Sequence, residues 1–125
     1  MRDFRKYVIW QKAIELTDRV YSFTDSFPKS EVYALSNQLQ RATVSIASNI
    51  AEGSSRSSEK DFAHFLEIAI GSAFEVETQL TIALRRSYIS QEDYEEVILI
   101  IGYLEKQINT FIQKLKNRQD STDSN

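Results

Sequence analysis

The side chains best suited to chemistry lie between positions 38 and 52. The polar residues of this stretch are Gln38, Arg41, Ser45, Asn49 and Glu52. They are spaced three or four residues apart and therefore share one side of a helix. Glu75 and Gln79 form a similar i, i+4 pair farther along the chain. A buried polar group needs a partner, so these residues predict a polar network within the chain or across a subunit contact. A ligand or ion site is the alternative.

Other residue types limit the chemistry that such a network could perform. The chain has no cysteine, no glycine-rich phosphate loop and no G-x-S-x-G motif. Its single histidine, His64, has Asp61 three residues before it and Glu67 three residues after it. A di-iron bundle needs two Glu-x-x-His motifs on separate helices, and one histidine cannot supply both. We expect no catalytic residues, no cofactor and no metal; a carboxylate metal-binding bundle is the second alternative for function.

Long helices are needed to position these residues. Only three glycines and one proline interrupt 125 residues, which argues for long uninterrupted helices. Ser30, Ser58 and Ser90 are predicted helix N-caps, and Gly53 is predicted to end the second helix in a left-handed conformation. The expected helices span about 7–25, 31–52, 59–87 and 91–117.

The apolar residues of the last two helices recur every three or four positions. The third helix has Phe62, Leu66, Ala69, Ala73, Val76, Leu80 and Ala83; the fourth has Tyr94, Val97, Ile101, Leu104, Ile108, Phe111 and Leu115. This period of 3.5 residues favours left-handed packing of nearly antiparallel helices. We predict an all-α fold: an antiparallel, up-down-up-down, left-handed four-helix bundle over residues 1–117. Residues 118–125 lack an apolar anchor and are expected to form a disordered tail.

Further apolar residues lie outside these stripes. They are Phe65, Ile68, Ile70, Phe74, Ile82 and Leu84 in the third helix, and Ile98, Leu99, Ile100, Tyr103 and Ile112 in the fourth. A helix that is apolar nearly all round is buried on more than one side. Gly71 and Gly102, each inside a helix, favour close approach of another helix. A wide core is one interpretation; we favour a subunit interface, and hence a homo-oligomer.

Charge is distributed unevenly in the predicted bundle. The net charge is −3, yet one end would collect a basic group comprising Arg2, Arg5, Lys6, Lys12, Arg56, Lys60, Lys114, Lys116 and Arg118. These residues can complement helix C-termini, or they can bind RNA, DNA or an acidic protein. Nucleic-acid binding through this basic end is the first alternative for function. Neither a signal peptide nor a membrane span is apparent, so we expect a cytoplasmic protein without a membrane partner.

The motifs of the chain resemble a known bacterial family. They are Arg2-Asp3-Phe4, Trp10-Gln11-Lys12-Ala13, Phe27-Pro28, Gln38-Leu39, Arg41, Ser45-Ile46, Ser48-Asn49-Ile50-Ala51-Glu52-Gly53, Phe62, Phe65-Leu66, Ala69, Gly71-Ser72, Glu75, Glu77-Thr78-Gln79-Leu80 and Ala83. Over residues 2 to about 115 the chain resembles the four-helix bundle proteins associated with intervening sequences of 23S ribosomal RNA genes. This resemblance implies a homopentameric ring without established catalytic activity. It also implies similarity to accessory proteins of diversity-generating retroelements, which bind a reverse transcriptase and nucleic acid. The expected function is therefore a non-catalytic scaffold or adaptor.

Overall fold

The computed structural model describes residues 2–123, and it describes side chains over residues 2–118. Within this part of the chain all regular structure is helical. The elements are η1 (Phe4–Lys6), α1 (Val8–Asp25), η2 (Lys29–Glu31), α2 (Leu35–Ser54), α3 (Glu59–Arg85) and α4 (Gln91–Asp123). The predicted all-α fold with four long helices is confirmed.

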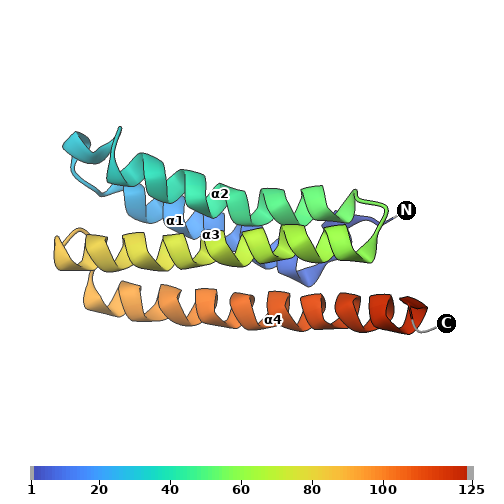
Figure 1. Ribbon diagram of the computed structural model, residues 1–125. Helices are drawn as coiled ribbons and strands as arrows, with labels where there is room; N and C mark the ends of the chain where they lie inside the picture. The colour runs from blue at the N-terminus through green and yellow to red at the C-terminus, as the bar shows by residue number, and fades with distance from the viewer. Residues whose placement is uncertain (1, 124–125) are drawn as a thin grey trace.

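The four long helices lie side by side along one direction (Figure 1). Each packs against two others: α2 contacts α1 and α3, while α4 contacts α3 and α1. Both ends of the chain lie at the same end of the bundle, next to the loop between α2 and α3 (Figure 1). The loops that follow α1 and α3 lie at the opposite end.

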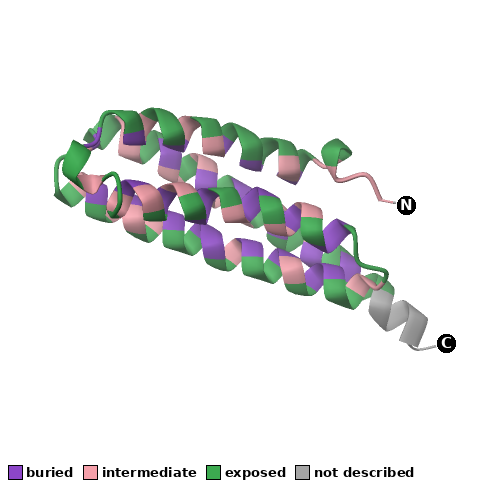
Figure 2. Cartoon of the chain, turned by 90° about the horizontal axis from the view of Figure 1, so that it is seen from above, coloured by how far each residue is buried: buried purple, intermediate pink, exposed green. Residues whose placement is uncertain are grey.

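The predicted apolar stripes form the core. Figure 2 shows buried residues on the inward sides of the helices and exposed residues on their outer sides. All seven stripe residues of α3, from Phe62 to Ala83, are buried. In α4, Ile112 is buried whereas the predicted stripe residue Phe111 is only partly buried. Burial of Leu and Ile side chains contributes about 1.5–3 kcal/mol each, which makes this core the main source of stability.

The second long helix begins later than predicted. Residues Lys29–Glu31 form the short 3₁₀ helix η2, and α2 starts at Leu35. Ser30 is therefore not an N-cap, and that prediction was wrong. The side chain of Glu31 takes the capping role, because its Oε2 accepts a hydrogen bond from the backbone N–H of Leu35 at 3.1 Å. A carboxylate at a helix N-terminus satisfies a free N–H and interacts favourably with the helix dipole.

Gly53 also differs from its prediction. It lies inside α2, which continues to Ser54, and its φ is not positive. A Cβ atom at this position would lie 2.7 Å from Cβ of Phe65 and 2.9 Å from Cδ1 of Phe62. Glycine is required here because α3 approaches the backbone of α2 so closely, and not because the helix ends.

The predicted N-caps of α3 and α4 are confirmed, whereas the predicted end of α4 is not. Ser58 and Ser90 are N-caps as predicted, accepting hydrogen bonds from the backbone N–H of Asp61 and of Asp93. Ser87 ends α3 with a φ of 62°, and the backbone N–H of the next residue bonds to Ala83 in a Schellman motif. At the other end, α4 continues to Asp123, beyond the end predicted at 117. The tail predicted for 118–125 falls on this extension and on residues 124 and 125, which lie outside the described residues.

Candidate functional site

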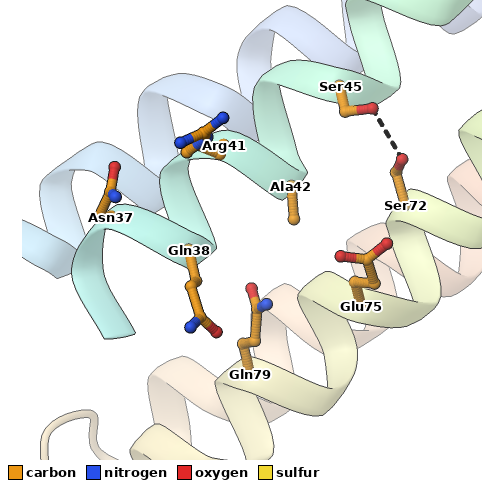
Figure 3. A pocket seen from close by; sticks show the side chains of 8 residues that line it. All are labelled: Asn37, Gln38, Arg41, Ala42, Ser45, Ser72, Glu75 and Gln79. Atoms are coloured by element: carbon orange, nitrogen blue, oxygen red, sulfur yellow. Dashed lines mark hydrogen bonds between the residues drawn. The ribbon is translucent and has the colours of Figure 1, made fainter. Parts of the chain in front are cut away.

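A cleft of about 350 Å³ separates parts of α2 and α3. Its lining residues are Asn37, Gln38, Arg41, Ala42 and Ser45 from α2, and Ser72, Glu75 and Gln79 from α3. Figure 3 shows Gln38 and Gln79 pointing toward each other across this cleft. The volume lies at the lower end of the range for small-molecule sites. Five of the seven residues predicted as a polar network therefore line one cleft.

The inner part of the cleft is closed by hydrogen bonds. Oγ of Ser45 lies 2.8 Å from Oγ of Ser72, as the dashed line in Figure 3 shows. The side-chain amide of Asn49 donates to the backbone oxygen of Ser45 at 2.8 Å and to its Oγ at 2.9 Å. The Ser45–Ser72 contact joins the two helices within one chain, and the bonds from Asn49 hold Ser45 in position within α2.

The outer part of the cleft is open. Among the described residues, Gln38, Arg41 and Glu75 have no hydrogen-bond or ion-pair partner for their side chains. Oε1 of Gln79 is buried and likewise lacks a hydrogen-bond partner in the described part of the chain. A buried acceptor without a partner costs about 1–3 kcal/mol. The cleft thus presents a guanidinium, a carboxylate and amide groups to whatever enters it.

Two residues change the predicted membership of the network. Glu52 does not belong to it, because its Oε1 accepts a hydrogen bond from Arg56 at 2.7 Å, outside the cleft. Ser72 does belong, although the sequence prediction of the network omitted it. Ser72 lies three residues before Glu75 and seven before Gln79, so its spacing was the signal that could have identified it.

The predicted basic end is assembled around Arg2. Its guanidinium donates to the backbone oxygens of Ser54 and Arg56 and to Oε1 of Glu59, the last at 3.0 Å. These contacts fasten the N-terminal segment to the loop between α2 and α3. Arg56 also lies over the ring of Phe65, 4.6 Å from its centroid. Both arginines therefore have structural partners within the chain.

Most of the remaining basic side chains at this end have acidic neighbours. The ion pairs are Arg5–Asp3, Lys12–Glu15, Lys116–Glu67 and Arg118–Glu59. Only Lys6, Lys60 and Lys114 of the predicted basic group lack an ion-pair partner within the described residues. Ion pairing lowers the positive charge that this end can offer to phosphate groups.

A second groove, of about 390 Å³, lies between α3 and α4. Its lining residues are Ile70, Phe74, Gly102, Glu105, Lys106 and Asn109. Burial, together with the nearby charge of Glu77, raises the pKa of Glu105 to about 7. No sequence pattern had marked these two glutamates as a pair, because they are 28 positions apart and meet only when α3 packs against α4.

The remaining predicted features are weaker as sites. Within the described residues, no three His, Asp or Glu side chains come together in a way that could hold a metal ion. His64 packs edge-on against the ring of Phe65, with ring centroids 6.0 Å apart. No helix in the described part of the chain is long and apolar enough to cross a membrane.

Comparison with known proteins gives two similarities. A model of the family described as 23S rRNA-intervening sequence protein matches residues 5–110. A crystal structure from Bacteroides thetaiotaomicron, of a protein of unknown function from the S23 ribosomal protein family, superposes with a TM-score of 0.75. Its sequence identity is 30%, and the match covers 84% of this chain and 98% of that one. No curated protein matches.

Proposed function

Because the chain belongs to the family of 23S rRNA-intervening sequence proteins, we propose that it acts as a non-catalytic scaffold in the form of a homo-oligomer. The proposed assembly is a pentameric ring of left-handed, up-down-up-down bundles. The 3.5-residue spacing of the apolar stripes supports the handedness, and the family resemblance supports the ring. Its physiological role would be to hold several copies of one surface in a fixed arrangement.

The observation that carries this proposal is the exposure of large apolar side chains on α3 and α4. Phe74 is 56% exposed, Leu99 is 75% exposed and Tyr103 is 64% exposed. The core of the bundle forms without them, since all seven stripe residues of α3 and five of the seven of α4 are buried. Large apolar side chains outside a finished core are typical of surfaces that bind another protein.

The two glycines within these helices also support a subunit interface. A Cβ atom at Gly71 or at Gly102 would meet nothing within 4 Å. Packing within the chain therefore does not explain why either position is glycine, although glycine inside a helix costs about 1 kcal/mol relative to alanine. Close approach of another subunit would explain both positions.

We favour this scaffold over a nucleic-acid-binding function. A phosphate-binding surface depends on basic side chains that are free to contact phosphates. Arg2, Arg56 and Lys116 are instead engaged by Glu59, Glu52 and Glu67. The chain as a whole carries a net charge of −3.

Native mass spectrometry of the purified protein tests the proposal. We expect an oligomer for the wild-type chain and a shift toward monomer for Phe74→Asp, which places a charge on the proposed contact. Tyr33→Asp is the matched control, because Tyr33 is 94% exposed in the turn before α2 and far from this surface. A wild-type protein that is monomeric at micromolar concentration would contradict the scaffold. Retardation of RNA that weakens with salt would favour the nucleic-acid alternative instead.

A further inference from the structure

The groove between α3 and α4 contains an acidic site that the chain itself does not complete. Oε2 of Glu105 is buried and has no hydrogen-bond partner in the described residues. On α3, Glu77 places a second carboxyl close enough for its charge to raise the pKa of Glu105. Lys106 lines the same groove, but within the described part of the chain it forms no ion pair with either glutamate. Two facing carboxyls of this kind require a proton or a cation between them.

The groove has space for such a cation. Gly102 forms part of its α4 wall, and a Cβ atom there would meet nothing within 4 Å. Ile70 and Phe74 supply the apolar wall on α3. A long side chain that is apolar along its stem and charged at its tip fits this combination.

Arg41 on α2 offers the complementary charge. It is exposed, and it has neither a hydrogen-bond nor an ion-pair partner among the described residues. Arg2, Arg19 and Arg56 each have an acidic partner. The planar guanidinium can bind carboxylates with two parallel hydrogen bonds, which suits a site made of two glutamates.

Arg41 and the glutamate pair lie in neighbouring parts of the bundle along its length. Arg41 and Glu75 line the same cleft between α2 and α3. Glu77 is two residues farther along α3, a displacement of about 3 Å along the helix axis. Glu105 of α4 interacts with Glu77 and lines the groove beside Ile70 and Phe74, which lie seven and three residues before Glu77 on α3. Rotation about an axis parallel to the bundle can therefore bring Arg41 of one copy to the acidic groove of the next.

We infer that Arg41 of one copy enters the α3–α4 groove of a second copy and pairs with Glu77 and Glu105. This inference rests on the proposed self-assembly and identifies its contact. The two surfaces differ, so the contact is head-to-tail, and a contact of this type forms a ring when its rotation closes after a whole number of copies. The cleft and the groove lie on opposite sides of α3 and face different directions, as ring closure requires.

The raised pKa of Glu105 agrees with an incoming cation. A carboxyl whose pKa is about 7 in the separate subunit is largely ionised only above that pH. Pairing with a guanidinium favours the ionised form, so assembly releases a proton and becomes stronger as the pH rises through 7. Glu77 from α3 and Lys106 from α4 are the charged residues that accompany Glu105 in this region.

Charge reversal on each side of the contact tests this inference. Sedimentation over a concentration series would compare the wild type with Arg41→Glu, Glu105→Arg and the double variant carrying both. We expect each single reversal to raise the dissociation constant at least about 30-fold, as breaking a buried ion pair does at other interfaces. The double reversal should recover most of this loss, because the two charges remain opposite. Lys114→Glu is the control, with the same charge change at an exposed position of α4 near the end of the bundle.

The outcomes separate this inference from the proposed function. If the wild type assembles and Arg41→Glu behaves like Lys114→Glu, the contact is wrong while the scaffold remains. If both single reversals weaken assembly without recovery in the double variant, Arg41 pairs with another group and the inference is also wrong. A monomeric wild type contradicts the scaffold itself. Circular dichroism of each variant, with Arg41→Gln as a milder replacement, excludes loss of folding as the cause.

Discussion

Helix α3 packs against two neighbours in very different ways. Against α2 it makes a close contact, where a Cβ on Gly53 would clash with Phe65, and a hydroxyl contact between Ser45 and Ser72. Against α4 it leaves open space beside Gly102 and brings together the carboxyls of two glutamates. At Gly53 and Ser45 the first seam is completed by the chain itself, whereas beside Gly102 the second seam leaves the Glu105 carboxyl without a hydrogen-bond partner among the described residues.

Glycine has a different structural role in each of the two seams. Gly53 is required by a neighbour inside the chain, while nothing inside the chain requires Gly102. In the same way, the hydroxyls of one seam satisfy each other, but the carboxyls of the other compete for a proton. Packing within the chain therefore explains Gly53 and the Ser45–Ser72 contact, whereas nothing within the described residues explains Gly102 or completes the Glu105 carboxyl.

The largest expected effect comes from replacing Gly53 with alanine. The new Cβ would lie 2.7 Å from Cβ of Phe65, so α2 and α3 must move apart. Overpacking of this kind typically costs about 1–3 kcal/mol, and we expect the upper part of that range. The midpoint of urea unfolding measures this loss. An unchanged midpoint would show that the seam is not as tightly packed as the geometry indicates.

The second effect is a pH dependence due to Glu105. Its pKa is raised from 4.5 to about 7 on folding, so the folded chain binds the proton more tightly than the unfolded chain. The contribution of protonated Glu105 to the free energy of unfolding is fully present below pH 4.5 and is lost as the pH rises through 7. Because the carboxyl is partly exposed and solvent screens its charge, we expect the free energy of unfolding to fall by roughly 1–2 kcal/mol over this pH range. Urea unfolding at pH 5 and pH 8, at a protein concentration low enough to dissociate the subunits, would show this loss, and Glu105→Gln should remove it.

A smaller effect is expected for Ser72→Ala. This change removes the hydroxyl contact with Ser45 but leaves Asn49 bonded to Ser45. The expected cost is about 0.5–1.5 kcal/mol, the net value of one hydrogen bond. A double-mutant cycle with Ser45→Ala measures the coupling directly. Additive effects of the two changes would mean that the hydroxyls do not stabilise the seam.

The smallest effect should have the opposite sign. In the separate subunit, Gly102→Ala adds a Cβ into open space and raises helix propensity, so the free energy of unfolding of that subunit should rise by up to about 1 kcal/mol. The same substitution thus destabilises one seam and stabilises the other. A loss of stability for Gly102→Ala, measured by the same urea unfolding, would contradict the open groove.

The fold was largely predictable because its signal is periodic. Apolar residues at intervals of three and four predicted the four long helices and most of their buried faces. The N-caps at Ser58 and Ser90 could also be predicted, because the signal for a cap lies within a few neighbouring residues, and both predictions were confirmed. The start of α2 was missed because the side chain of Glu31 caps the helix in place of Ser30.

The candidate site was less predictable, because side-chain partners depend on which helices meet. The spacing on α2 placed Gln38, Arg41 and Ser45 on one side, and they do line one cleft. Spacing could not show that Glu52 pairs with Arg56 instead. Gly53 was misread because a close neighbour from another helix leaves no local trace in the sequence.

Glu59 has a consequence for how the chain could be rearranged. Its two carboxylate oxygens meet Arg2 near the beginning of the chain, at 3.0 Å, and Arg118 near its end, at 3.7 Å. One side chain at the start of α3 therefore contacts residues near both ends of the chain, and Figure 1 shows the N and C labels at the same end of the bundle. Nearby termini tolerate circular permutation. A short linker between them, with new ends opened at the exposed turn around Ser87, should yield a permuted chain with the same core.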